Sequence, residues 1–388
     1  MSSLKSIIFS PPLIVDMGSC FTKAGFAGDS EPLLYFPTVV GYPEYPVGDK
    51  DYLIGGKAIE NYDISKLVFP IRYGMVYDFG GWETIIKYII EELRIQPERQ
   101  TIVYIYRFLQ PRDTIIRVAE ELFEEYNFHG LSFLPSELLS AYSAGLRKAL
   151  VIDSGDHITQ IVPISYPKSL IYSLRRMNIG GDNITKYLAK LLARKGFYAD
   201  PENIRMMEKM REIKEEYCYF SDDFRSELKD ARKNPLKYST RILLNGTTIE
   251  LTEEKFWAPE IMYRPMFVGL ESKPLHELII DSIFSIDLEE REAFYRNIIL
   301  TGGNTLLRNF CKRLYRELKE IAPKKPAEYI NVRVHPAPKY SAFLGASIMA
   351  SFPEFKDLVI TKEQWEVVGT ESVVRTLSFF QHQQDKYD

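Results

Sequence analysis

Two stretches of the 388-residue sequence decide its fold: LIVDMGSCFTK at residues 13–23 and LVIDSGDHITQ at residues 150–160. Each stretch has three apolar residues and then Asp, one residue, Gly, three residues and Thr. The two aspartates, Asp16 and Asp153, lie 137 positions apart (153 − 16). An internal duplication is the economical explanation, because two related halves would each carry one such loop facing a shared cleft.

Three short apolar runs predict buried strands: residues 13–16, 150–153 and 298–301. Continuous apolar runs are typical of strands that are covered on both faces. Apolar residues at helical spacing follow at 82–93, 114–126, 137–145, 185–196, 203–224 and 307–321. Strands that alternate with helices predict an α/β fold.

Length and composition set broad limits on the function. A chain of 388 residues with 45% apolar residues is expected to form two domains with ample cores. The net charge of −4 argues against general nucleic-acid binding. The longest apolar runs are too short for a membrane span, and no secretory signal is expected. Cys20, Cys218 and Cys311 are predicted to be buried thiols in a reducing compartment.

Two segments are predicted to be insertions in this α/β framework. Residues 38–69 are rich in Gly, Pro and Tyr, and residues 41–48 read as an exposed loop. Residues 181–270 contain a helical stretch, a basic turn at 229–237 and a hairpin around Asn245-Gly246. The polar tail from Gln381 is expected to be loose.

The aspartate loops have residue types that suit a polyphosphate and Mg²⁺. A strand that ends in Asp and a Gly turn brings backbone N–H groups and a carboxylate to one sheet edge. Asp16 and Asp153 would face the metal ion through water. The phosphates would contact Gly18, Ser19, Lys23, Gly155 and Asp156. The alternative is that each Asp-x-Gly sequence is only a tight turn between strands.

A third loop has less specific features. The loop at 301–305, TGGNT, precedes the helical stretch at 307–321. Adjacent glycines before a helix permit the close approach of a ligand, and a helix N-terminus favours an anion. Paired glycines are also common in ordinary turns.

These motifs together resemble those of actin and the actin-related proteins. The resemblance rests on DMGSCFTKAGFAGD (16–29), DSGDHITQIVP (153–163), REIKEEYCY (211–219), LTGGNT (300–305), GLESKPLHE (269–277) and KYSAFLGASIMASF (339–352). It implies an actin-like ATPase fold, with two related RNase H-like α/β halves and two insertions around a nucleotide cleft. The implied four subdomains cover residues 1–37, 70–149 and 341–388; 38–69; 150–180 and 271–340; and 181–270.

The resemblance also implies ATP or ADP and Mg²⁺ as cofactors. Metal coordination through water is carried over to Asp16 and Asp153. Nucleotide binding is carried over to Gly18, Ser19, Lys23, Gly155, Asp156, His157, Lys214, Glu215, Gly302, Gly303, Asn304 and Lys339. Without the resemblance, Lys214 and Glu215 would be interpreted as an exposed helix face.

The sequence departs from the family where the attacking water is positioned. Ser136 stands in place of a glutamine, and Gln160 in place of a histidine. Gln160 can orient a water but cannot accept its proton. We therefore expect slow ATP hydrolysis with binding retained. His157 replaces a glycine, either as a bulky surface side chain or as a ring that reaches the γ-phosphate.

The resemblance implies an ATP-binding cytoskeletal protein of the cytoplasm that forms filaments with itself or with other actin-family subunits. Actin-binding proteins are possible partners, whereas direct nucleic-acid or membrane binding is not expected. The docking loop near Tyr42–Asp49 is shorter than in actin, and Leu270, Leu275 and Leu278 are candidate filament anchors. The alternative is a non-polymerising subunit of a chromatin-remodelling or filament-nucleating complex, and it would imply a nuclear location. A sugar kinase or a chaperone is disfavoured, because a catalytic base and a peptide-binding domain are not recognised.

Overall fold

The structure is a computed structural model that describes residues 10–45, 50–244 and 246–382. The chain divides into two compact units, which are described separately. Unit 1 comprises Met1–Gly145, Tyr166–Ser169 and Tyr340–Asp388, and unit 2 comprises Leu146–Ser165 and Leu170–Lys339. The finer division into four subdomains stays a prediction.

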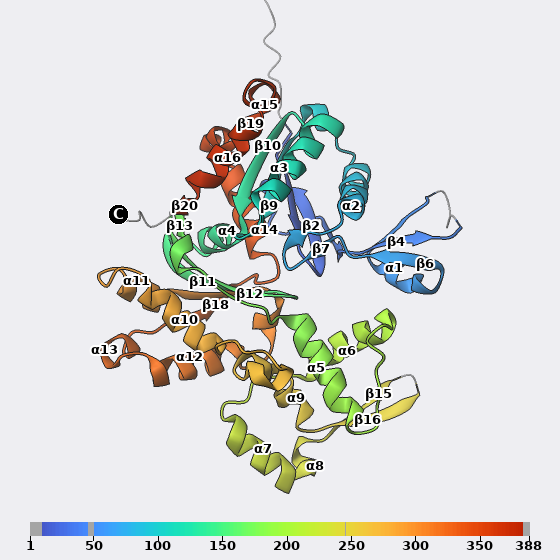
Figure 1. Cartoon of the computed structure of the whole chain (residues 1–388), viewed down its shortest axis with the longest axis vertical. Coiled ribbons are helices and arrows are strands. Elements are labelled where there is room, and N and C mark those ends of the chain that lie inside the picture. The colour runs from blue at the N-terminus through green and yellow to red at the C-terminus, as the bar shows by residue number, and fades with distance from the viewer. Residues whose placement is uncertain (1–9, 46–49, 245, 383–388) are drawn as a thin grey trace, which may run out of the picture. The chain divides into compact units, whose positions relative to one another are not determined.

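Unit 1 is built on a six-stranded sheet in the order β19-β10-β9-β1-β2-β3 (Figure 1). The central strands β1, β9 and β10 are parallel, and β2, β3 and β19 are antiparallel to their neighbours. The strands span Leu13–Met17 (β1), Phe21–Phe26 (β2), Leu34–Pro37 (β3), Thr101–Tyr106 (β9), Gly130–Pro135 (β10) and Ile360–Thr361 (β19). Residues 13–15 are almost fully buried, as their apolar run predicted.

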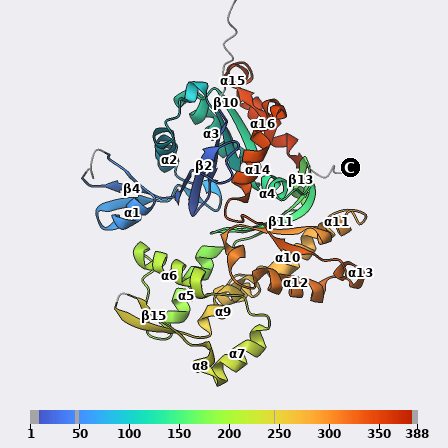
Figure 2. The same ribbon diagram turned by 180° about the vertical axis from the view of Figure 1, so that it is seen from behind.

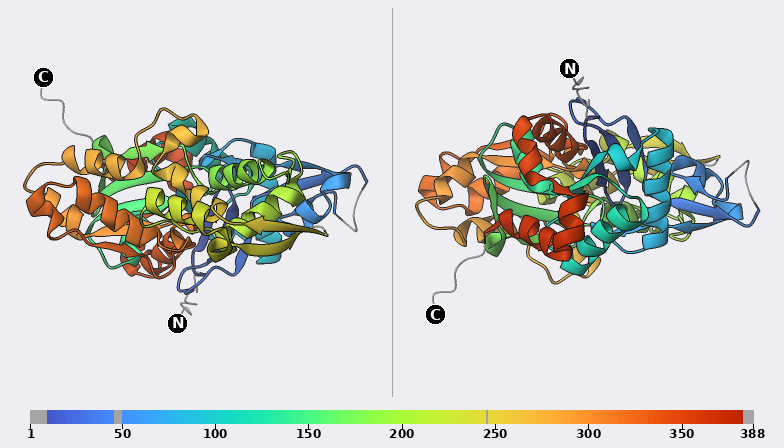
Figure 3. Two further views of the ribbon diagram at one scale, coloured as in Figure 1. Left: turned by 90° about the horizontal axis from the view of Figure 1, so that it is seen from below. Right: turned by 90° about the horizontal axis from the view of Figure 1, so that it is seen from above.

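Helices and a small second sheet complete unit 1. The helices are α2 (Phe79–Glu92), α3 (Arg112–Glu120), α4 (Ser136–Ser143), α14 (Ser341–Ala350), α15 (Lys362–Val368) and α16 (Thr370–Phe379). The view in Figure 3 from above shows α3 and α16 side by side on the sheet. Trp82 of α2 donates from Nε1 to the Tyr104 hydroxyl on β9 at 3.1 Å, which fixes this helix against the sheet.

The small sheet of unit 1 corrects one expectation. It has the order β5-β4-β6 and packs with helix α1 in a small lobe (Figure 2). The bounds are Val40–Pro43 (β4), Leu53–Ile54 (β5), Gly56–Glu60 (α1) and Ser65–Val68 (β6). Gly41 is buried within β4 and a Cβ there would lie 3.1 Å from that of Ala58, so the expectation of an exposed loop beginning at residue 41 is wrong. Pro46–Asp49 of the expected docking loop lie outside the described residues.

Unit 2 contains a sheet whose core order is β18-β17-β11-β12, with β14 beside β12 (Figure 1). The strands are β11 (Lys148–Ser154), β12 (Thr159–Ser165), β14 (Arg175–Met177), β17 (Ile298–Thr301) and β18 (Val332–Val334). The main helices are α5 (Gly181–Ala193), α6 (Ile204–Tyr217), α7 (Phe224–Lys233), α8 (Pro235–Tyr238), α9 (Glu254–Trp257), α10 (Leu275–Phe284), α11 (Arg291–Arg296), α12 (Phe310–Ile321) and α13 (Lys324–Ala327). Figure 3 shows α10 and α12 packed side by side from below.

Shorter strands and helical turns complete the two units. They are β7 (Ile71–Arg72), β8 (Met75–Val76), β13 (Lys168–Leu170), β20 (Gln381–His382), the π-helical turn η3 (Glu121–Glu125) and the 3₁₀ turns η1 (Tyr62–Ile64), η2 (Pro97–Arg99), η4 (Ile171–Ser173), η5 (Pro259–Met262), η6 (Pro265–Val268), η7 (Gly303–Leu306) and η8 (Pro353–Leu358). The predicted hairpin in unit 2 is present as β15 (Thr240–Leu244) and β16 (Thr247–Leu251); its residue Asn245 lies outside the described residues.

The two units share one strand plan. In unit 1 the order β10-β9-β1-β2-β3 pairs Asp16 with Lys23 across the hairpin. In unit 2 the order β18-β17-β11-β12-β14 pairs Asp153 with Gln160. Each aspartate is therefore opposite the residue seven positions later, at the end of a strand with a parallel neighbour. This correspondence supports the duplication inferred from the sequence.

Several helices of the structure begin or end at residues other than those predicted from the sequence. The stretch at 203–224 is helical only to Tyr217, and Phe224 begins α7. The stretch at 307–321 begins as α12 at Phe310, because Asn309 before it is left-handed with φ 65°. The predicted basic turn at 229–237 is also wrong, since Lys229–Lys233 belong to α7 and Pro235 begins α8.

The structure corrects part of two predictions: that all three cysteines are buried, and that three leucines are surface anchors of a filament. Cys218 is buried, but Cys20 and Cys311 are only half-buried, and none of the three forms a disulfide within the described residues. Leu275 is completely buried in the core of unit 2, and Leu278 packs against that core. The expectation that Leu275 is a surface anchor is therefore wrong, whereas Leu278 is partly exposed and Leu270 is exposed. Within the described part of the chain, none of the helices combines the length and apolar character needed to cross a bilayer.

A buried ion-pair network lies between α12 and η5 in unit 2. Nη1 and Nη2 of Arg313 donate to the two carboxylate oxygens of Glu260, each at 3.1 Å. Arg264 also donates to Glu260 at 3.1 Å, and Arg313 donates to Glu317 at 2.6 Å. Glu260 is fully buried, and burial raises its pKa while Arg313 lowers it. A buried carboxylate of this kind depends on its charged partners.

Candidate functional site

The loop between β1 and β2 places the first group of predicted residues in unit 1. Lys23 donates from Nζ to Asp16 Oδ2 at 2.9 Å, and both side chains are mostly buried. A Cβ on Gly18 would lie 3.0 Å from the Phe21 carbonyl oxygen. Ser19 accepts a hydrogen bond from the Gly74 N–H at 3.1 Å. The turn therefore combines a carboxylate, a cation and a hydroxyl within one short hairpin.

Ser136 lies at the same edge of the unit 1 sheet as Asp16. It follows the end of β10, while Asp16 lies at the end of β1, and the two strands are separated by β9. Two strand spacings correspond to about 10 Å. Ser136 is 4% exposed, and its Oγ has no hydrogen-bond partner among the described residues. A buried hydroxyl in this condition usually has a water or ligand partner.

The second group of predicted residues forms around β11 and β12 in unit 2. Asp153 is opposite Gln160 across the hairpin and beside Thr301 on the parallel strand β17. Asp153 is 6% exposed, and Gln160 is completely buried. The carboxylate, the amide and the start of the TGGNT loop are thus brought to one edge of this sheet.

Gly302 fits this edge because it has no side chain. Its φ is 85°, and an added Cβ would lie 2.3 Å from the Ser154 carbonyl oxygen and 2.5 Å from Asp153 Oδ1. Such contacts are far shorter than van der Waals distance. Asn304 donates from Nδ2 to the Gly155 carbonyl at 2.6 Å. The TGGNT loop is therefore in direct contact with the second aspartate loop.

Lys214 is also part of this group. It is 4% exposed and donates from Nζ to the Gly181 carbonyl at 3.1 Å. The neighbouring residue Glu215 instead lies on the exposed face of α6, where Arg211 contacts it at 3.5 Å. Gly303 begins η7 with open space around it. Lys339 is exposed and follows Pro338, whose carbonyl accepts from the Gly302 N–H at 2.9 Å.

Asp156 and His157 form a pair at the tip of the second loop. The His157 Nε2 and Asp156 Oδ2 atoms are 3.8 Å apart. Burial raises the pKa of Asp156, while His157 and Lys214 act in the opposite direction. His157 is part-buried beside this carboxylate, so it is not simply a surface side chain.

The sequence reasoning missed the start of α5. The Gly181 N–H donates to the Gly155 carbonyl at 3.0 Å, and the Asp182 N–H donates to the Asp156 carbonyl at 2.8 Å. A Cβ on Gly180 would lie 2.3 Å from the Asp156 carbonyl oxygen. The available signal was the pair Gly180-Gly181 before a helix, the pattern already noted at Gly302-Gly303.

The two groups of residues suit a nucleotide and a hard metal ion. Asp16 and Asp153 supply carboxylate oxygens, the ligand type that Mg²⁺ prefers. Each unit also has a glycine turn that admits close approach of a phosphate. Within residues 10–45, 50–244 and 246–382, no group of three or more His, Cys, Asp or Glu residues forms a metal cluster. In each unit, one carboxylate with water ligands fits the coordination that Mg²⁺ prefers.

One comparison with known proteins bears on the whole chain. The family model described as Actin matches residues 10–378. The match therefore includes both aspartate loops, the TGGNT loop and every other predicted site residue.

Proposed function

We propose, for a chain that belongs to the actin family, that it binds ATP with Mg²⁺ through the aspartate loops of both units and assembles with actin-family subunits in the cytoskeleton. Proteins of this family generally bind ATP or ADP with a divalent cation. Filament formation, slow hydrolysis and the cytoplasmic location are parts of this proposal.

The shared strand plan of the two units is the observation that carries this proposal. Asp16 is paired in register with Lys23, and Asp153 with Gln160, at the carboxyl ends of equivalent strands. Ligands of open α/β sheets bind outside the carboxyl ends of the strands. Two equivalent loops of this kind are suited to the two sides of one polyphosphate.

The proposed roles follow from the local chemistry. Lys23, held beside Asp16, neutralises phosphate charge, and the glycine turns let backbone N–H groups approach phosphate oxygens. Asp16 and Asp153 would hold Mg²⁺ through water, and the ion would neutralise charge on the phosphates. Gln160 and Ser136 orient a water near the terminal phosphate. Neither residue can accept a proton as a histidine does, which predicts slow hydrolysis.

The full chain is expected to bind Mg–ATP in calorimetry, with one nucleotide per chain. Asp153→Asn keeps the shape of the side chain but removes its charge, and should weaken Mg–ATP binding by about 10²-fold, because charged interactions at buried sites are strong. Chelation of Mg²⁺ should weaken binding by the wild-type chain more than binding by this variant. Equal affinity of the two proteins would contradict the proposal.

Assembly is tested separately. Met266 and Leu270 of the segment at 265–270 are exposed, at 75% and 37%, and exposed apolar residues are candidate interface contacts. Electron microscopy of the purified protein with Mg–ATP should show filaments. If the protein forms no filaments and instead co-purifies with a fixed set of partners, the alternative is favoured. That alternative is a subunit of a remodelling or nucleating complex.

Gln160→His is expected to accelerate ATP hydrolysis by about 10-fold or more, because general-base assistance contributes about 10²–10⁴-fold when it is fully aligned. The substitution is made in a buried position opposite Asp153, so thermal stability is measured alongside a single-turnover assay. Gln160→Asn, which shortens the amide without adding a base, is the control. A Gln160→His variant that folds and hydrolyses ATP no faster than the wild type would show that the base is not the missing group.

A further inference from the structure

Helix α7 of unit 2 carries a row of cations that the proposed nucleotide site does not use. Arg225, Lys229 and Lys233 occur at four-residue spacing, so they lie on one helix face and span about 12 Å. All three side chains are exposed. They have no hydrogen-bond or ion-pair partner within the part of the chain that the structure describes. We name these three residues the α7 basic row.

The acidic residues of α7 are already satisfied inside unit 2. Glu227 accepts a hydrogen bond from the Tyr219 hydroxyl at 2.7 Å. Asp230 accepts from Lys237 at 2.6 Å and from Tyr238 at 2.8 Å. These contacts lower the pKa of Asp230 to about 2, so the carboxylate stays ionised.

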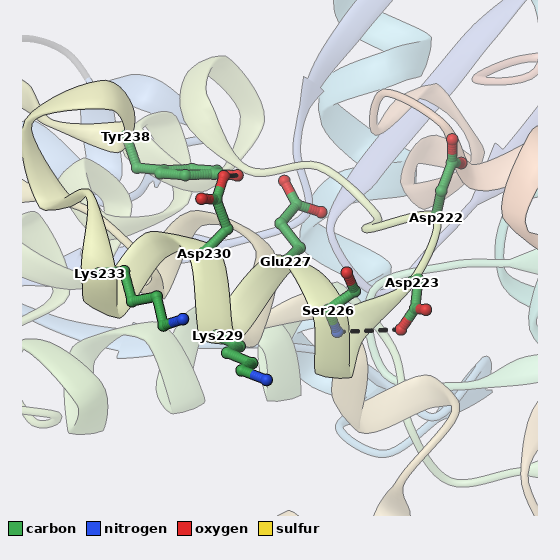
Figure 4. A pocket seen from close by; sticks show the side chains of 8 residues that line it. All are labelled: Asp222, Asp223, Ser226, Glu227, Lys229, Asp230, Lys233 and Tyr238. Carbon is green, nitrogen blue, oxygen red and sulfur yellow. Dashed lines mark hydrogen bonds between the residues drawn. The ribbon is translucent and has the colours of Figure 1, made fainter.

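Figure 4 shows how the helix separates its charges. Glu227 and Asp230 point toward the side of Tyr238, whereas Lys229 and Lys233 project from the opposite side of the ribbon. Asp223 caps the helix through the Ser226 N–H at 3.1 Å. The intramolecular contacts of α7 therefore use its acids and leave Arg225, Lys229 and Lys233 available.

The cationic side of α7 is also hollowed. Arg225, Leu228, Lys229, Arg232 and Lys233 line a hollow of about 380 Å³. Arg232 already has partners within unit 2. Its Nε lies 3.7 Å from Glu253 Oε1, and its guanidinium group lies over the Trp257 ring. The half-buried side chain of Leu228 supplies an apolar patch among the cations.

We propose that the α7 basic row is a docking surface for an acidic helical segment of a partner protein. Carboxylates at four-residue spacing on one face of such a helix match the three cations. The row is short, and the chain has a net charge of −4 and a pI of about 5.9. A nucleic-acid site would be expected on a basic domain with an extended positive surface, so an acidic helix is the better match.

The test uses the full chain and two labelled alanine-based peptides of about 16 residues, a length at which such peptides form helix in water. The peptides have the same composition, but one aligns its glutamates at positions i, i+4 and i+8 and the other distributes them around the helix. Fluorescence anisotropy at low salt should show tighter binding of the aligned peptide by about tenfold, and weaker binding as salt is raised.

The triple variant Arg225→Gln/Lys229→Gln/Lys233→Gln should weaken binding of the aligned peptide by about tenfold, the effect of three exposed ion pairs. The control Lys57→Gln/Lys324→Gln/Lys325→Gln removes the same charge from exposed lysines elsewhere and should bind as the wild type does. Equal binding of the two peptides, or equal affinity of the two triple variants, would overturn the proposal. Tighter binding of an oligo-dT strand than of the aligned peptide would assign the row to nucleic acid and overturn it also. Mg–ATP affinity of the triple variant is measured in parallel, and its retention separates this surface from the nucleotide site.

Discussion

Replacement of Gly302 by alanine is expected to reduce the affinity for Mg–ATP by more than about 100-fold, which is more than about 2.7 kcal/mol of binding free energy. The new Cβ would lie 2.5 Å from Asp153 Oδ1 and 2.3 Å from the Ser154 carbonyl oxygen. One of these neighbours is backbone, so the loop or the carboxylate has to move. The φ of 85° adds strain for any residue with a Cβ, of about 1–2 kcal/mol. Isothermal calorimetry of the purified variant measures the loss.

Gly56→Ala is the matched control for this substitution. Gly56 begins α1 in unit 1, a Cβ there meets nothing within 4 Å, and its φ is not positive. We expect wild-type affinity and unchanged or slightly raised stability, because alanine favours a helix. Circular dichroism shows whether Gly302→Ala is folded. A folded Gly302→Ala protein with wild-type affinity would show that binding does not depend on the space that Gly302 leaves beside Asp153.

Arg313→Met is expected to destabilise unit 2 by about 3–5 kcal/mol, because it leaves a buried carboxylate without its main partner. Arg313 is 3% exposed and donates twice to the fully buried Glu260. Urea unfolding followed by tryptophan fluorescence measures the loss, and Arg296→Met, in an exposed pair with Glu292, should cost less than about 1 kcal/mol.

The pH dependence of the Arg313→Met variant gives a second readout. Burial already raises the pKa of Glu260, and loss of the arginine raises it further. A carboxyl whose pKa is higher in the folded than in the unfolded protein binds its proton more tightly when folded. The variant should therefore lose stability as the pH rises from the unfolded pKa of Glu260 to its folded pKa. The double variant Arg313→Met/Glu260→Gln should lose this dependence. A stability loss that does not vary with pH would mean that packing, and not charge, is the cause.

The sequence predicted the framework better than its connections. The apolar runs at 13–16, 150–153 and 298–301 fall within β1, β11 and β17, because strands buried on both faces leave a continuous apolar pattern. Periodicity extended the helix at 203–224 too far, since apolar residues in Cys218–Phe220 belong to the core but not to a helix. Leu275 and Leu278 show the same limit, because an apolar residue in a motif can serve the core or a partner.

The site was predictable where residue type determines the chemistry. The aspartates and glycines of the two loops stand out in the sequence, and the structure gathers each group at the edge of its own sheet. Gly180-Gly181 was missed because its importance depends on contact with the Asp156 carbonyl, which is distant in the sequence. Lys214 was likewise a candidate only through the resemblance, since a lysine within a charged helix gives no sign that it is buried.

The register shared by the two hairpins predicts which substitutions the two loops can accept separately. Lys23 and Gln160 hold equivalent places in a repeated design, one a cation and the other a neutral amide. In a chain that carries the same motif twice, residues of one copy can be replaced while the other copy keeps its residues. Under the proposed function, Lys23 makes the first hairpin's attraction for a charged ligand sensitive to ionic strength, whereas a change at Gln160 alone alters how water is oriented and leaves Asp153 in place.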